Sequence, residues 1–208
     1  MLARQSEPQG NEARLRVLAA AVEEFARHGF ANARIRSIVE AARANVAAVN
    51  YYFGGKDGLY RATVMSLAVR MDPLDAARVN ALRGAPERLR AAVGQLILRL
   101  ATSQGPTPLA RILAHEALAQ TGQLPQLLEE TMGAELKLLA AILREVAGVE
   151  ADDEYLRRRA VGIVGQCVLY LHAAPSVEPE ALDILAGQIA ETSAREARRA
   201  PASPVAEK

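Results

Sequence analysis

Apolar residues recur along this chain at three- and four-residue spacings, the pattern of amphipathic helices. In the N-terminal part they predict a long helix over residues 11–28 and two short helices over about 35–42 and 46–53. Gly29 stands where the long helix is expected to end. An apolar stripe of that helix is expected to cover both short ones, and it contains Leu15, Leu18, Ala19, Val22, Phe25 and Ala26.

The rest of the chain reads as further helices separated by glycine and proline. No segment has the alternating pattern of a strand, so the prediction is an all-α protein of about nine helices. We divide it into an arm (1–10), a three-helix unit (11–56), a larger helical domain (57–200) and a disordered tail (201–208). The helices expected in the larger domain cover residues 56–81, 86–103, 108–120, 125–147, 153–173 and 179–199.

The short helix over residues 46–53 is predicted to present an uncharged surface. Asn45 is a good N-cap residue for it, and Val46, Val49 and Phe53 are expected to face inward. A helix surface in water usually carries lysine and glutamate, whereas small, amide and phenolic side chains suit contact with base edges and phosphates in a major groove. Such side chains are found on the outer surface here: Ala47, Ala48, Asn50, Tyr51 and Tyr52.

The tract NVAAVNYYFGGKDGLY, residues 45–60, resembles the recognition helix and following loop of the TetR family of transcriptional repressors. Its Asn-Tyr pair and Gly-Gly-Lys-Asp-Gly-Leu-Tyr run look most like a subgroup related to the CerR regulators. The resemblance implies an N-terminal helix-turn-helix domain, a homodimer on a palindromic double-stranded DNA operator, and a C-terminal cavity for a small-molecule effector. Arg43 departs from the pattern, because the family usually has glycine there, and Ala44 is smaller than usual.

Charge and composition support this interpretation. The net charge is only +1, but residues 1–56 carry eight basic and five acidic residues, while the remainder is net acidic. A basic N-terminal quarter is typical of a phosphate-binding domain. No apolar run is long enough to cross a bilayer, and the polar N-terminus and single Cys167 predict a cytoplasmic protein without a signal peptide or internal disulfide.

Further residues are predicted to contact DNA around the short helix. Arg36 begins the preceding helix, and Arg43 is placed to reach a phosphate. Lys56 lies at a helix N-terminus, which favours anions, and the family's matching lysine contacts the DNA backbone. Arg4 and Gln5 on the arm are expected near the adjacent minor groove.

Two tracts, 125–147 and 153–173, carry more apolar surface than one small helical body needs. They predict a homodimer interface formed as a four-helix bundle, or else they fill the core of one protomer. Polar groups on otherwise apolar C-terminal helices are paired with one another or with solvent, or else they line an effector cavity. These candidate ligand-binding residues are Arg111, His115, Glu116, Tyr170 and His172.

No enzyme, cofactor or metal signature is found. His115-Glu116 begins like a zinc-protease motif, but Ala119 occupies the position of the second histidine. Cys167 is expected to be a buried thiol. We therefore expect a ligand-responsive, DNA-binding repressor. The alternative is a helical dimer that binds small molecules without recognising an operator, which Arg43 and the modest basic excess leave open.

Overall fold

A computed structural model of the protein describes residues 6–119, 124–148, 150–173 and 178–201. These ranges confirm the all-α class, with ten helices rather than about nine. A small hairpin interrupts them. The elements in chain order are α1 (Ser6–Asn32), α2 (Ile35–Ala41), α3 (Val46–Phe53), α4 (Lys56–Val69), α5 (Ala76–Asn80), α6 (Ala85–Leu100), β1 (Ala101–Thr102), β2 (Gly105–Pro106), α7 (Pro108–Ala119), α8 (Leu124–Ala147), α9 (Asp153–Ala173) and α10 (Pro179–Ala197).

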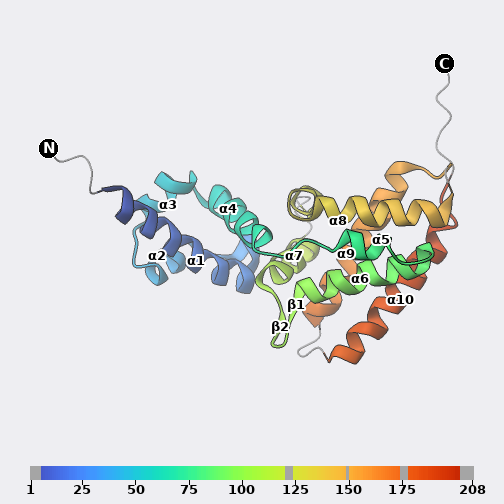
Figure 1. Ribbon diagram of the computed structural model, residues 1–208. Coiled ribbons are helices and arrows are strands. Elements are labelled where there is room, and N and C mark those ends of the chain that lie inside the picture. Colours follow the sequence, from blue (N-terminus) through green and yellow to red (C-terminus); the bar gives the residue numbers. More distant parts are fainter. Residues whose placement is uncertain (1–5, 120–123, 149, 174–177, 202–208) are drawn as a thin grey trace, which may run out of the picture.

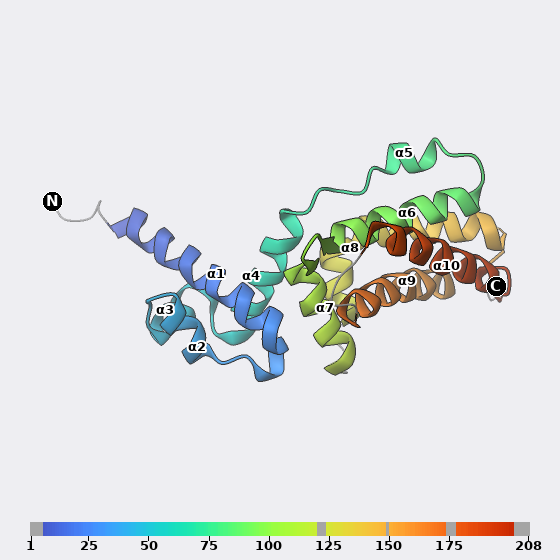
Figure 2. The same ribbon diagram turned by 90° about the horizontal axis from the view of Figure 1, so that it is seen from below.

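The helices form two groups, which we call the head (α1 to α4) and the body (α5 to α10). Figures 1 and 2 show the head at one end of the molecule and the bundle of α6, α8, α9 and α10 at the other. Between them lies α7, which packs on α1 and α4 of the head and on α9 of the body. The head therefore meets the body mainly through α7 and the start of α8.

The head is built around one side of α1. Its buried side chains pack on α2 and α3, as expected, and also on α4. Leu15 and Ala19 of the predicted stripe are exposed, because the buried stripe is centred on Val17 and Ala21. The helix also begins earlier than predicted, at Ser6, so residues 6–10 are helical rather than part of an arm. Gly29 interrupts it with φ 68° and ψ 174°, close to the predicted end. Arg4, Gln5 and residues 202–208 of the expected tail lie outside the described residues.

The long helix predicted over residues 56–81 is wrong in its second half. It ends at Val69, and residues 70–75 lead to the short α5. The reason is Pro73, which has no N–H for a helical hydrogen bond and restricts the residue before it. Asp75 caps α5, and its own N–H donates to Oε1 of Gln95 at 2.8 Å, which fastens this segment to α6.

The hairpin between α6 and α7 was not predicted. The helix expected to reach residue 103 ends at Leu100, after which Ala101 pairs with Pro106 and Thr102 with Gly105. Gly105 has φ 112°, a conformation that favours glycine. Strands of two residues are too short to show an alternating pattern, so no periodic signal could indicate them.

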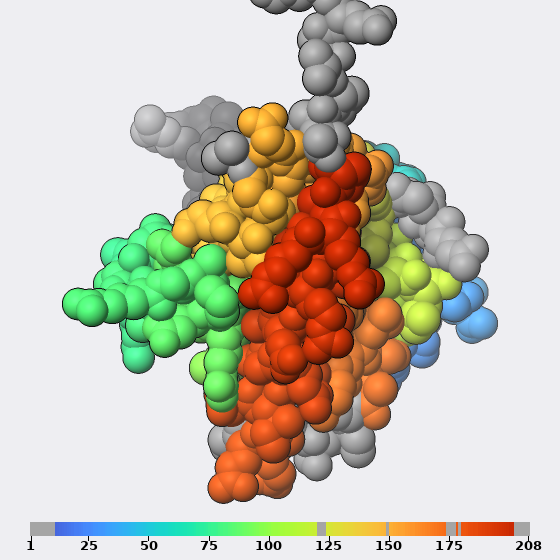
Figure 3. Space-filling view, turned by 90° about the vertical axis from the view of Figure 1, so that its right-hand side faces the viewer, coloured from blue at the N-terminus to red at the C-terminus, as the bar shows by residue number. Residues whose placement is uncertain are grey.

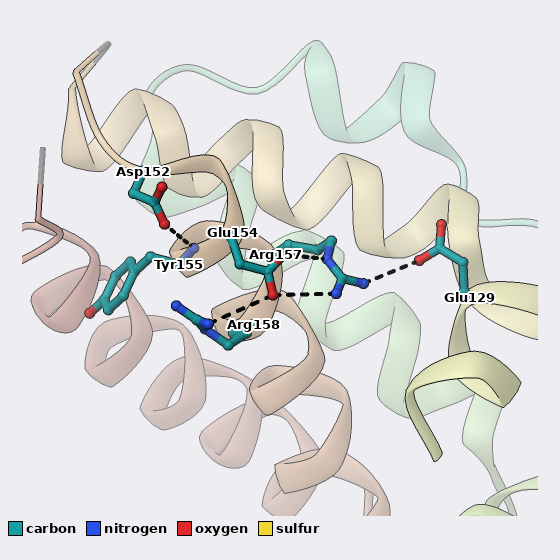
Figure 4. A network of polar contacts seen from close by, with 6 residues as sticks. All are labelled: Glu129, Asp152, Glu154, Tyr155, Arg157 and Arg158. Carbon is teal, nitrogen blue, oxygen red and sulfur yellow. Dashed lines mark hydrogen bonds and ion pairs between the residues drawn. The ribbon is translucent and has the colours of Figure 1, made fainter. Parts of the chain in front are cut away.

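The start of α9 is held by polar contacts that also reach α8 (Figure 4). The Asp152 carboxylate accepts the N–H of Tyr155 at 2.7 Å, as an N-cap does. Glu154 pairs with Arg157 and Arg158, and hydrogen bonding from Arg157 lowers the pKa of Glu154. Arg157 also reaches Glu129 on α8 at 3.9 Å, so the network links the two helices.

The body core lies between α6, α8, α9 and α10. Large side chains of α8 and α9 fill it, including Leu139, Leu143, Ile163 and Leu171. Cys167 is buried there as predicted, and burial raises its pKa to about 12, so the thiol is unreactive at neutral pH. On the face of the body in Figure 3, α10 lies across the bundle and packs closely on α6. Within the described ranges, no helix has the length and apolarity needed to span a membrane.

Candidate nucleic-acid interface

The turn and second helix of the predicted motif have the expected geometry. Asn45 caps α3, and its Oδ1 accepts the N–H of Ala48 at 2.8 Å. Gly54 ends α3 in the left-handed region at φ 73°, and its N–H donates to the Asn50 carbonyl. The helix therefore has only eight residues, and it is held by contacts with α1, α2 and α4.

The turn between α2 and α3 has the regular geometry of a helix C-terminus, but the residue in its left-handed position is unusual. Arg43 has φ 50°, and its N–H donates to the Glu40 carbonyl. The N–H of Ala44 reaches back to the Val39 carbonyl at 2.9 Å, which completes a Schellman motif. Glycine normally occupies the left-handed position of this motif. Arg43 therefore strains the turn without changing its hydrogen bonds.

We expect Arg43→Gly to raise the free energy of unfolding by up to about 1 kcal/mol, because it relieves the left-handed strain. The same change should lower DNA affinity, because it removes an exposed positive charge beside α3. Urea unfolding and fluorescence anisotropy with labelled DNA measure the two effects separately. Arg43→Asn is the control, since asparagine tolerates the left-handed region but carries no charge. If affinity is unchanged in both variants, Arg43 does not contact DNA.

The outer surface of α3 is exposed and uncharged, as the sequence predicted. Tyr51 is 83% exposed, and Ala47 and Asn50 are exposed beside it, while Val49 is buried in the head. Ala48 and Tyr52 are half-buried at the edge of this surface.

Two residues of α3 that were expected to face inward are not fully buried. Val46 is 50% exposed, because it is the first residue of α3 and a helical side chain leans toward the N-terminal end, beyond the packed part of the helix. Phe53 is only half-buried, and the Arg14 guanidinium covers its ring at 5.4 Å from the ring centre. The ring of Tyr52 stands edge-on to those of Tyr51 and Phe53, at 4.9 and 6.4 Å, so the three rings form one continuous row.

Cationic residues lie on the segments that flank α3 in the chain. Arg36, with its side chain 88% exposed, lies 3.8 Å from the carboxylate of Glu40, an exposed pair of the kind that contributes little to stability. Lys56 is half-buried: its Nζ donates to the Ala31 carbonyl at 3.3 Å and lies 4.9 Å from the centre of the Phe30 ring. A lysine ammonium has three N–H donors, and within the described ranges this is the one hydrogen bond of Lys56, so the other two donors can serve an anion. Arg36, Arg43 and Lys56 thus provide positive charge around α3.

The joint between α3 and α4 depends on Gly58. A Cβ built on Gly58 would lie 1.7 Å from the Phe53 carbonyl oxygen, so the start of α4 sits directly against the end of α3. Gly55, with φ 116°, makes the sharp turn between them. The sequence showed these glycines only as part of the family pattern, because the contact across the turn is not visible without coordinates.

The five candidate ligand-binding residues occupy different surroundings. Arg111 is exposed and donates to the Pro106 carbonyl, and Tyr170 is 41% exposed. His115 and His172 do meet, with ring centres 5.8 Å apart. None of four cavities with volumes of 260 to 520 Å³ is lined by any of the five, so their role as a ligand site stays a prediction.

Glu116 instead forms a buried link between the head and the body. Its Oε1 accepts the hydroxyl of Tyr60 on α4 at 2.9 Å, and both side chains are at most 3% exposed. Burial, followed by the hydrogen bond to Glu116, raises the pKa of Tyr60, so the phenol stays protonated. The Tyr60 ring lies 5.0 Å from those of both Phe25 and Phe30. Sequence analysis selected Glu116 as a polar residue on an apolar helix but missed Tyr60, which is 56 residues away.

Comparison with known families identifies the chain. Residues 17–63 match the sequence profile described as bacterial regulatory proteins, tetR family. Residues 85–194, more than half of the chain, match the C-terminal domain of the HTH-type transcriptional dual regulator CecR. The chain belongs to the TetR family. It is therefore a DNA-binding transcriptional regulator. The C-terminal match is to the CecR regulators, whereas the tract over residues 45–60 suggested a subgroup related to the CerR regulators.

Relatives agree with this family. CecR of Shigella flexneri is 27% identical over 173 residues, which cover 78% of this chain and 77% of CecR. The repressor SCO4008 of Streptomyces coelicolor is 39% identical over 75 residues, 33% of this chain and 38% of the repressor.

Solved structures share the fold at low sequence identity. FadR of Bacillus subtilis in complex with stearoyl-CoA has a TM-score of 0.61 at 18% identity, covering 87% of this chain and 97% of FadR. HlyIIR, a hemolysin II transcriptional regulator, has a TM-score of 0.60 at 18% identity, covering 88% and 97%.

Proposed function

We propose that this TetR-family regulator is a ligand-responsive repressor that binds a palindromic operator as a homodimer. Each protomer inserts α3 into a major groove, where Ala47, Asn50 and Tyr51 meet base edges. Arg36, Arg43 and Lys56 bind the flanking phosphates. The observation that carries this proposal is the exposed, uncharged surface of α3, with cationic residues on α2, on the turn and at the start of α4 that flank it in the chain.

The remaining predicted contacts have supporting roles in this proposal. Asn45 is engaged in capping through its Oδ1, which leaves its amide N–H₂ group for a phosphate. Ala48 and Tyr52 are half-buried, so they shape the contact surface, and the hydroxyl of Tyr52 is a donor for the DNA backbone.

The homodimer is proposed through α9, with the exposed edge of α8 beside it (residues 153–173 and 125–147). On α9, a Cβ added at Gly162 or Gly165 would meet no described atom within 4 Å outside the nearby backbone of its own helix, so a partner helix has room to approach. Leu169 is 41% exposed on the same helix. The large side chains of α8 are buried within the protomer, so this helix would contribute mainly its small exposed residues, such as Ala134 and Ala141.

Ligand binding in the body would act on DNA binding through the head–body contacts. We assign the transmitting role to α4, which ends at Val69 and is therefore shorter than the helix predicted over residues 56–81. Its coupling to the body runs through the Tyr60–Glu116 hydrogen bond and the ion pair of Arg61 with Glu130 on α8. A ligand that alters these contacts would change the position of the head and weaken operator binding.

Selection of bound sequences from a random DNA pool, with the full-length protein, tests the proposal. The expected result is a palindrome with half-site centres about one helical turn apart or slightly more. Sedimentation of the complex should give two protein chains for each palindrome. Selected DNA without sequence preference, or with a single half-site bound by one chain, would contradict the proposal.

Replacing Lys56 with methionine should weaken binding to all DNA sequences and flatten its salt dependence. Each lost phosphate contact reduces the slope of log affinity against log salt concentration by about 0.9. Methionine keeps an apolar chain beside Phe30, so the packing of the head is retained. The control is Lys137→Met on the exposed side of α8, which should leave affinity and slope unchanged. An unchanged slope in the Lys56 variant would refute the phosphate contact.

A further inference from the structure

A cavity of about 260 Å³ lies at the contact between the head and the body. Asp57, Tyr60 and Arg61 of α4 line one side, and the first turns of α8 line the other. Ligand pockets for drug-sized molecules usually measure about 300–1,000 Å³, so this cavity suits a compact molecule. None of the residues selected from the sequence as ligand-binding belongs to it.

The charges that line the cavity favour a cation. Glu130 accepts hydrogen bonds from Arg61 and, at 2.9 Å, from the amide of Gln126. Asp57 has no ion pair within the described ranges, so the lining has two carboxylates for one cationic side chain. The Tyr60 hydroxyl donates its hydrogen bond to Glu116. The carboxylates of Asp57 and Glu130 are therefore the main acceptors for a ligand in the cavity.

From this arrangement we infer that the cavity is an effector site for a compact organic cation, such as an amine or an amidine. Its N–H groups bind Asp57 and Glu130, while Leu127 and Tyr60 contact its apolar part. Charge-assisted hydrogen bonds of this type are stronger than those between neutral groups. The inference rests on the proposed ligand-responsive function and specifies where the ligand binds and what its charge is.

Binding at this position would act directly on the head. The cation competes with Arg61 for Glu130 and so weakens the ion pair that joins α4 to α8. It also touches Tyr60, whose hydrogen bond to Glu116 is the second link between the two groups of helices. Since coupling between two binding sites is reciprocal, operator DNA would reduce the affinity for the cation by the same factor.

The test compares benzamidinium with benzamide, two molecules of nearly the same shape that differ in charge. Titration calorimetry with the full-length, DNA-free protein should show saturable binding of benzamidinium at least tenfold tighter than that of benzamide. Asp57→Asn should remove this preference. Glu129→Gln is the matched control, because Glu129 lies next to Glu130 on α8 but does not line the cavity.

Equal binding of the two molecules, no binding of benzamidinium at 10 mM or below (about −2.7 kcal/mol or weaker), or an unchanged preference in Asp57→Asn would overturn the inference. Thermal unfolding of each variant verifies that it is folded. A separate anisotropy titration with operator DNA distinguishes the two hypotheses. Cation binding without DNA binding would leave the site standing and refute the repressor, whereas DNA binding without cation binding would do the opposite.

Discussion

Replacing Gly58 with alanine is expected to abolish operator binding. The added Cβ would lie 1.7 Å from the carbonyl oxygen and 3.0 Å from the carbonyl carbon of Phe53, both backbone atoms at the end of α3. Such a clash can be relieved only if α3 and α4 move apart. Overpacking of this kind typically costs about 1–3 kcal/mol or more, which exceeds the roughly 1 kcal/mol that alanine gains over glycine in a helix.

Anisotropy with operator DNA and thermal unfolding measure this effect. The control is Gly94→Ala in α6, where the new Cβ would be in ordinary contact with Ala186 at 3.8 Å. That variant should be at least as stable as the parent protein and should bind DNA normally. Normal DNA binding by Gly58→Ala would show that α3 does not need its contact with α4.

The second large effect is expected from Tyr60→Phe. Phenylalanine keeps the ring contacts with Phe25 and Phe30 but removes the hydroxyl that Glu116 accepts at 2.9 Å. Loss of a hydrogen-bond partner for a buried polar group costs about 1–3 kcal/mol. Urea unfolding should show this loss, and the altered head–body contact should also change the effect of a ligand on DNA affinity.

A double-mutant cycle with Glu116→Gln would isolate the interaction between the two side chains. Tyr155→Phe is the comparison, because its hydroxyl donates to a half-buried backbone carbonyl, that of Glu196, at 3.1 Å. We expect a smaller loss there. If both variants lost the same free energy of unfolding, the buried Tyr60–Glu116 hydrogen bond would stabilise the protein no more than the half-buried hydrogen bond of Tyr155 does.

Local signals predicted the elements that local chemistry controls. The N-cap at Asn45, the left-handed Arg43 and the bounds of α9 could be derived from the sequence because each depends on residues close together in the chain. Pro73 is an equally local signal. It indicates that the helix predicted over residues 56–81 ends before this proline, as α4 does at Val69.

Contacts between distant segments could not be derived in this way. Tyr60 meets Glu116 and Arg61 meets Glu130 across separations of 56 and 69 residues, and no periodicity specifies such pairs. The approach of His115 on α7 to His172 on α9, with ring centres 5.8 Å apart, is a further contact that no periodicity specifies. The exposure of Ala47, Asn50 and Tyr51 was therefore predictable from the sequence, whereas the half-buried positions of Ala48 and Tyr52 and the contacts that join the head to the body were not.

The close approach of α1 to α7 limits how this regulator can be recombined with others. At Gly29 a Cβ would lie 2.9 Å from that of His115, so the two backbones fit each other with no room for a different side chain. A chimera that joins this head to a foreign body after Val69 would lose that fit. Exchange of DNA specificity by grafting should succeed only when α7 is transplanted together with the head.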